Sequence, residues 1–354
     1  MRKIGTFDNE AQAIAFIEYL QKRHITALIE EDSLSYAIWV HDEGHIENAK
    51  KLFADVKKEP SKKKIFFGAY KEKAELAQSP FRPFITRAML FACILVYILA
   101  QVQSHHEREN YPGMNSLPPV AKALLFEFPK DQEILGEITD RFGLEAFRSN
   151  TLPDSADPLI KKHNEALPWI GVYNILLQPK QLQNALWDGL FMTKIKEGEV
   201  YRLFTPAILH LNLLHILFNL LWLMLLGKII EFNMGKMRFF LLILIAAGVS
   251  NVSQYLMTGP LFMGVSGVLS AFIGYIWVRK KIAPWEVYLI PKQNITYFLI
   301  FILGFLAVSV VCFLLAYFNV YVFLLPVANT AHISGLLAGM LIARLGILSK
   351  RNLR

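Results

Sequence analysis

Residues 264–281 have the sequence GVSGVLSAFIGYIWVRKK, an apolar segment that ends at three basic residues. Ser266 and Arg279 are 13 residues apart, which corresponds to about 20 Å of helix. The hydrocarbon core of a bilayer is about 30 Å thick, so a helix that starts at Ser266 would begin roughly 10 Å below one face. A polar group at that depth is costly, and the serine is therefore a candidate functional residue.

Six apolar segments in the chain have membrane length or nearly so. They cover residues 84–102, 204–227, 237–257, 266–278, 295–318 and 328–348. Because of these segments the whole chain is 54% hydrophobic and only 19% charged, with a mean hydropathy of +0.35. These values exclude a wholly soluble protein. We therefore expect an α-helical polytopic membrane protein built on six helices.

Basic residues flank these segments at the ends that would lie on one side of the membrane in a six-pass arrangement. They are Arg82, Arg87, Lys228, Lys236, Arg238, Arg279, Lys280, Lys281, Lys350, Arg351 and Arg354. Because Lys and Arg collect on the cytoplasmic side, six passes would place both termini in the cytoplasm and residues 103–200 outside. A loop of that length is expected to be partly structured, with helical or membrane-associated stretches at 124–126, 134–147 and 169–177. The first apolar segment begins after residue 80, so no cleavable signal peptide is expected.

Residues 1–56 have the pattern of a small α+β domain with the order β-α-β-β-α. Strands are expected at residues 3–7, 25–29 and 36–40. Asp8 is the expected N-cap of the first helix. Residues 57–82 contain seven lysines and form a basic juxtamembrane linker, which suits anionic lipid better than nucleic acid. We therefore attribute the net charge of +8 to basic residues that set the orientation in the membrane and contact lipid. Residues 83–354 are expected to form the membrane domain.

Two other polar residues have the same predicted depth as Ser266. His332 precedes Arg344 by 12 residues, about 18 Å of helix, and His215 precedes Lys228 by 13 residues, about 20 Å. Small residues on the fourth and sixth segments would let these two helices approach closely. They are Gly267, Ala271 and Gly274 on the fourth segment and Gly335 and Gly339 on the sixth. The pattern predicts that Ser266 comes within hydrogen-bond reach of His332.

The cluster contains the residue types of a serine nucleophile and its base. Ser266 lies between Gly264 and Gly267, which allow the backbone to turn tightly around an exposed hydroxyl. His332 is the candidate general base and acid. Because a nucleophilic serine needs such a base, the pair indicates nucleophilic catalysis inside the membrane.

An oxyanion site is also predicted. His215 and Asn219 are four residues apart and hence on one helix face, where they can offer N–H donors beside the Ser266 backbone amide. Residues 201–354 contain no aspartate, and their only acids are Glu231 and Glu286. We therefore expect a Ser/His dyad and not a triad with an aspartate.

Other chemistries fit these residues less well. The metalloprotease string His-Glu-x-x-His does not occur, and the spacing of His210, His215 and His332 is poor for zinc, so no metal is expected. An aspartyl mechanism would need two carboxylates. Structural roles are open too, because membrane serines bond to their own helix and asparagines join helices. His210 is expected to be structural and to hold the first loop.

Three strings of this sequence resemble those of rhomboid intramembrane serine proteases. They are HLNLLHILFN at residues 210–219, GVSG at 264–267 and AHISG at 331–335. The resemblance covers roughly residues 201–348, with the motifs on three helices in the family's order. Residues 1–56 and the linker are similar to the cytoplasmic domain of the GlpG-like bacterial subgroup.

The resemblance implies hydrolysis of peptide bonds in transmembrane segments of membrane-protein substrates, without a cofactor or a metal. It implies a six-helix rhomboid-type bundle in the bacterial inner membrane. Ser266 would be the nucleophile, His332 the general base and acid, and His215 and Asn219 the oxyanion hole. Gly264, Gly267 and His210 would support the site. A catalytically silent relative that binds membrane proteins is the second hypothesis, and a transporter is a distant third.

This sequence departs from the family's pattern at several positions. The family often has a tyrosine four residues after the nucleophile, where this chain has Ser270. Tyr201 replaces the tryptophan that precedes Arg202 in the family, and the first loop is longer than usual in the subgroup. The family's gate would correspond to the region of Trp222 and to residues 294–328.

Overall fold

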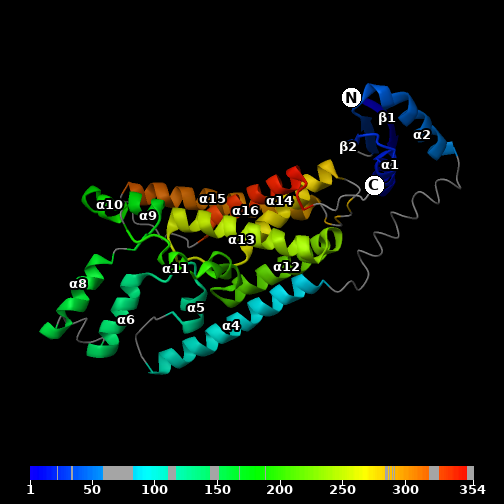
Figure 1. Cartoon of the computed structure of the whole chain (residues 1–354). Helices are drawn as coiled ribbons and strands as arrows, with labels where there is room; N and C mark the ends of the chain where they lie inside the picture. Colours follow the sequence, from blue (N-terminus) through cyan, green and yellow to red (C-terminus); the bar gives the residue numbers. More distant parts are fainter. Residues whose placement is uncertain are drawn as a thin grey trace.

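The computed structural model describes a small N-terminal domain and a helical bundle (Figure 1). The described residues are 1–21, 23–32, 35–58, 83–110, 117–143, 151–166, 168–187, 189–283, 286, 288, 290, 292–318 and 327–348. Residues 59–82 of the expected linker 57–82 lie outside this set. Its first two residues belong to the last helix of the N-terminal domain.

The N-terminal domain has the predicted order β-α-β-β-α. Its elements are β1 (Arg2–Phe7), α1 (Glu10–Gln21), β2 (Ala27–Asp32), β3 (Ser35–Val40) and α2 (Ile46–Lys58), with a 3-10 turn at Glu43–His45. The strands form an antiparallel sheet in the order β1-β3-β2. Phe16, Leu20 and Ile38 are fully buried in its core. One detail of the prediction was wrong: Asn9 and not Asp8 holds the cap position of α1, since its carbonyl accepts the first helical N–H groups.

Among the described residues, six long helices make up the bundle. They are α4 (Phe84–Asn110), α12 (Leu213–Met234), α13 (Lys236–Thr258), α14 (Ser266–Ile282), α15 (Lys292–Tyr317) and α16 (Asn329–Leu345). Four of them contain stretches that are long and apolar enough to cross a membrane: Phe84–His106, Leu213–Met234, Lys236–Thr258 and Gln293–Tyr317. The other two, α14 and α16, have 17 residues each, or about 25 Å of helix. The prediction of a shortened fourth helix that starts at Ser266 is confirmed.

The predicted second span, 204–227, was wrong at both ends. A 3-10 turn at Val200–Leu203 precedes it, its own first residues form a second 3-10 turn at Thr205–Ile208, and the helix begins only at Leu213. The cause is local: Pro206 lies in the second turn, and Asn212 caps α12 by accepting the His215 N–H at 2.9 Å. Lys228 therefore lies within α12, which continues to Met234, and it does not mark the helix end.

The long connection between α4 and α12 is partly helical, as expected. It contains α5 (Pro119–Leu124), α6 (Lys130–Phe142), α8 (Asp157–Glu165), α9 (Val172–Leu176), α10 (Lys180–Trp187) and α11 (Thr193–Lys196). We call the described residues of 117–199 the insert. Its helices project beyond the ends of α12 and α13, and α9 and α10 lie beside the end of α15 (Figure 1). Of the stretches expected to be helical, 124–126 differs most, because α5 ends at Leu124.

Candidate functional site

Ser266 and His332 lie at the N-terminal ends of the two short helices. Ser266 is the first residue of α14, and His332 is in the first turn of α16. Ser266 Oγ and His332 Nε2 are 2.8 Å apart, within hydrogen-bond distance. His332 is 7% exposed. Among the described residues, its Nδ1 atom has no hydrogen-bond partner. The structure thus brings the two residues together as a pair, without a third residue at the imidazole.

Glycines allow α14 and α16 to approach closely enough for this contact. A Cβ atom on Gly335 would lie 2.1 Å from the Gly267 carbonyl oxygen, and one on Gly339 would lie 1.9 Å from that of Ala271. A Cβ on Gly274 would lie 2.3 Å from the Leu336 carbonyl oxygen. Each distance is too short for any larger residue. The small-residue faces predicted on these helices therefore form the α14–α16 interface.

The loop before Ser266 passes close to the start of α12. Gly264 has φ +121, a conformation that L side chains rarely adopt. A Cβ atom there would lie 2.8 Å from His215 Cε1 and 3.7 Å from Asn219 Nδ2. Both predicted oxyanion residues are therefore beside Gly264, two residues from the serine. The depth estimate for His215 used the wrong helix end, but its position next to this loop agrees with the expected level.

The two oxyanion candidates also have bonds within α12 or to the segment just before it. Asn219 Nδ2 donates to the His215 carbonyl over 2.9 Å, which uses one of its two N–H groups. His215 Nδ1 faces the Leu211 backbone N–H at 3.5 Å. His210 is buried, and its ring centroid lies 5.2 Å from that of His215. His210 therefore packs against His215, and its supporting role stays a prediction.

Gln254 of α13 contacts the site, although the sequence analysis did not identify it. Its Oε1 atom accepts the backbone N–H of Ala331, the residue before His332, over 2.8 Å. Its Nε2 atom donates to Thr258 Oγ1 over 2.8 Å. Gln254, Ser250 and Asn251 are buried polar residues in α13, a helix that is apolar enough to cross a membrane. These polar residues within an apolar span were the feature of the sequence that could have identified Gln254, because polar groups inside a membrane helix need partners.

Ser270 lies four residues after Ser266, at the position where the resemblance described above would place a tyrosine. Its hydroxyl donates to the Ser266 carbonyl over 2.9 Å and is fully buried. In the part of the chain that the structure describes, no aromatic ring is paired with the His332 imidazole. Because Ser270 provides no ring at this position, the His332 side chain is held by its contact with Ser266 and by its own backbone.

The two acids of residues 201–354 are both engaged away from the pair. Glu231 accepts the N–H groups of Ile85 and Thr86 at the start of α4. Glu286 accepts from Arg279 Nε over 2.8 Å. These contacts give both carboxylates structural partners, Glu231 at the start of α4 and Glu286 at Arg279.

Arg202 holds the end of α5 against the bundle. Its Nη1 atom donates to the carbonyls of Lys122 and Leu125, and its Nε atom donates to Glu199 over 2.6 Å. Hydrogen bonds from Tyr201 and Arg202 lower the pKa of Glu199. Tyr201 thus replaces a tryptophan but takes part in the same cluster.

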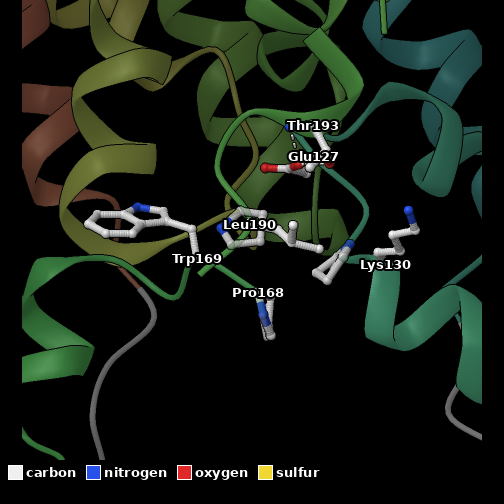
Figure 2. A pocket seen from close by; sticks show the side chains of 8 residues that line it. Glu127, Lys130, Pro168, Trp169, Leu190 and Thr193 are labelled. Atoms are coloured by element: carbon white, nitrogen blue, oxygen red, sulfur yellow. Dashed lines mark hydrogen bonds between the residues drawn. The ribbon is translucent and has the colours of Figure 1, made fainter. Parts of the chain in front are cut away.

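Figure 2 shows a small pocket away from the Ser266–His332 pair, where the insert meets the bundle. Pro168, Trp169 and Leu190 line it together with Pro260, which follows the end of α13. Glu127 lies at its edge and accepts hydrogen bonds from the Thr193 backbone N–H and hydroxyl. Glu127 Oε2 also accepts from the Tyr255 hydroxyl, so the carboxylate joins the insert to α13.

Comparison with known proteins gives two family matches. Residues 197–349 match the rhomboid domain, and residues 1–81 match the cytoplasmic N-terminal domain of rhomboid serine protease. The rhomboid protease GlpG of Yersinia pestis (strain Pestoides F) is 32% identical over 174 residues, which are 49% of this chain and 58% of that protein. The rhomboid protease GlpG of Photorhabdus laumondii is 37% identical over 145 residues, 41% of this chain and 47% of that protein. The chain spans about half the length of the curated relatives it matches.

Proposed function

We propose that the chain is a rhomboid-type intramembrane serine endopeptidase that cleaves transmembrane segments of membrane proteins, as its matches to the rhomboid domain and to the rhomboid cytoplasmic domain support. The observation that carries the proposal is the 2.8 Å contact between Ser266 Oγ and His332 Nε2 at the start of two short helices. A hydroxyl is a weak nucleophile unless an adjacent base accepts its proton. The imidazole is in position to do so.

In the proposed reaction, Ser266 Oγ attacks the scissile carbonyl carbon while its proton passes to His332 Nε2. The C–N bond then breaks as Nε2 returns that proton to the leaving amine, which leaves an ester on Ser266. Water then gives a proton to His332 Nε2 and attacks the ester carbonyl carbon. The C–Oγ bond breaks as Nε2 passes that proton to Ser266 Oγ, which releases the acid product and restores the free hydroxyl. General acid–base steps of this kind contribute about 10²–10⁴-fold to a rate.

His215 and Asn219 are proposed to stabilise the oxyanion together with the Ser266 N–H. The support is their contact with the Gly264 backbone, whose lack of a side chain leaves room beside the serine. Ser266 is the first residue of α14, so its N–H is among those without a helical acceptor. Donors that are already oriented towards a developing charge are among the largest contributions to catalysis.

A serine-reactive probe tests the nucleophile directly. We expect a fluorophosphonate to label Ser266 in the detergent-solubilised full chain, and Ser266→Ala to abolish the labelling. Ser334→Ala is a matched control, because the Ser334 hydroxyl only donates to the Thr330 and Ala331 carbonyls of its own helix. Labelling that survives Ser266→Ala would exclude this serine as the nucleophile.

The second candidate function is that of a catalytically silent rhomboid relative that binds membrane proteins. The presence of both Ser266 and His332, in contact, favours the enzyme. Comparative membrane proteomics of the wild type and Ser266→Ala separates the two. New membrane-protein fragments only in the wild type support the protease, whereas identical fragment patterns with unchanged client binding support the silent relative.

We further propose how the protein is arranged in the bacterial inner membrane. Residues 1–56 form the cytoplasmic domain, 57–82 a basic linker that contacts anionic lipid, and 83–354 the membrane protease domain with both termini in the cytoplasm. The positive charges that end α14 support this orientation. The connection 103–200 is then extracytoplasmic. No nucleic-acid partner is proposed.

A further inference from the structure

The insert binds the end of α13. Trp169 Nε1 donates to the Tyr255 carbonyl over 3.0 Å, and Asn174 Nδ2 donates to the Thr258 carbonyl over 3.1 Å. Both carbonyls belong to the last turn of α13. The Tyr255 carbonyl also accepts the Gly259 N–H over 2.9 Å, whereas the Thr258 carbonyl lies where a helix runs out of its own N–H donors. Asn174 Nδ2 also donates to the Ile170 carbonyl over 2.8 Å, which fixes the amide in this position. The insert thus supplies side-chain caps for α13.

The backbones of the insert and of the following turn are in direct contact. A Cβ atom on Gly171 would lie 2.3 Å from the Gly259 nitrogen, and one on Gly259 would lie 2.8 Å from the Ile170 carbonyl carbon and oxygen. Both glycines have positive φ, +87 and +80. Only glycine satisfies both the conformation and the close approach. The turn that ends α13 is therefore shaped to fit the insert.

The chain from 259 to 265, which we call the nucleophile loop, runs from this turn to Ser266. Phe262 of the loop is 7% exposed and packs in one cluster with Trp169 and Phe126 of the insert. Pro260 lines the pocket beside Trp169 that Figure 2 shows. The apolar side chains at the start of the loop are therefore held by the insert.

The other end of the nucleophile loop is also held. The Gly264 N–H donates to the Pro206 carbonyl over 2.9 Å, and α14 follows immediately. Because the nucleophile loop is short and is held at both ends, a shift of the Gly259 turn would displace Ser266. Misplacement of a reacting atom by about 1 Å can cost about 10²-fold in rate.

We propose that Trp169, Gly171 and Asn174 of the insert are positioning residues that hold the nucleophile loop, and with it Ser266, in the reactive place. This inference rests on the proposed function, since it takes Ser266 as the nucleophile. It gives the long connection a role in catalysis, although none of the three residues touches Ser266 or His332.

The test is the rate constant of fluorophosphonate labelling of the full chain in detergent. Gly171→Ala introduces a Cβ against the Gly259 backbone, and we expect the rate constant to fall by about tenfold or more. Gly143→Ala is the matched control, because Gly143 has φ +84 but nothing within 4 Å of its Cβ position. It has the same backbone strain without the contact, and its rate constant should stay within about twofold of the wild type.

Asn174 provides a second variant that keeps the backbone unchanged. Asn174→Asp replaces a donor by a carboxylate that faces two carbonyl oxygens, and we expect about a tenfold lower rate constant. Asn174→Gln keeps the amide donor and should recover part of the loss. A purely structural role would lower the fraction of protein that is labelled and its melting temperature, but not the rate constant of the labelled molecules.

The outcomes separate this inference from the proposed function. Rate constants equal to wild type in both Gly171→Ala and Asn174→Asp overturn the inference while Ser266 labelling stands. A wild-type protein that does not react, or labelling that persists in Ser266→Ala, overturns the proposed function itself. Lower rate constants in both variants, with Gly143→Ala close to wild type, support the positioning role.

Discussion

At the scale of single residues, the proposed chemistry depends on one imidazole. We predict that His332→Ala lowers the cleavage of a model transmembrane substrate by about 10²–10⁴-fold or more, because Ser266 loses the imidazole that is in position to accept its proton. The ring lies at the start of α16, whose packing rests on Gly335 and Gly339, so the helix should remain in place. Turnover and the melting temperature are measured together. Retained turnover in a folded His332→Ala protein would remove this histidine from the mechanism.

Residue patterns predicted the contact of Ser266 with His332 and the nearby positions of His215 and Asn219, but not the contact that Gln254 makes. The serine and the histidine could be predicted because the spacing of glycines within a single helix can be counted directly along the sequence. Gln254 was not found, because its bond to the Ala331 N–H joins two helices that are far apart in sequence. Its polarity in an apolar span marked it as unusual, but only the packing of α13 on α16 gives it a partner.

At the scale of helices, α4 is attached to α12 through one buried carboxylate. Glu231 accepts two backbone N–H groups and the Thr86 hydroxyl at the start of α4. We predict that Glu231→Gln lowers the free energy of unfolding in mild detergent by about 2 kcal/mol, because bonds to a charged acceptor weaken and one donor is left unpaired. Thermal unfolding measures this change. Glu197→Gln is the control, as its side chain is more than half exposed and should change stability little. Equal stability of the two variants would contradict the capping role.

Helix boundaries could be predicted where the apolar composition changes at the same place as the local backbone. This holds for α14, where Ser266 and Gly267 begin a helix whose basic end is clear. It fails for α12, because the apolar run continues through residues 204–212 while Pro206 and the Asn212 cap keep the backbone out of the helix. Local capping and not hydropathy determines that boundary.

At the scale of the whole molecule, the insert and the N-terminal domain have different relations to the site. The sequence indicated only that the long connection is partly structured, since the contacts of Trp169 with Tyr255 join residues 86 positions apart. By contrast, the N-terminal domain has its own buried cluster, which includes Phe16 and Ile38, and it shares no buried residue with the cluster of the bundle. Whether a part of the molecule supports the site therefore does not depend on its distance from Ser266 and His332 along the sequence.

This difference predicts opposite results for changes to the two parts. Deletion of residues 1–56 should leave cleavage of a model transmembrane substrate within about tenfold of the full chain, because the proposed catalytic groups all belong to the bundle. Substitution at Gly171, in contrast, should lower the rate although it leaves the composition of the bundle unchanged. Cleavage is measured in detergent and in vesicles with anionic lipid, and Ser266→Ala in the truncated chain gives the background. Complete loss of cleavage in a truncated protein that still unfolds cooperatively would show that the N-terminal domain takes part in catalysis.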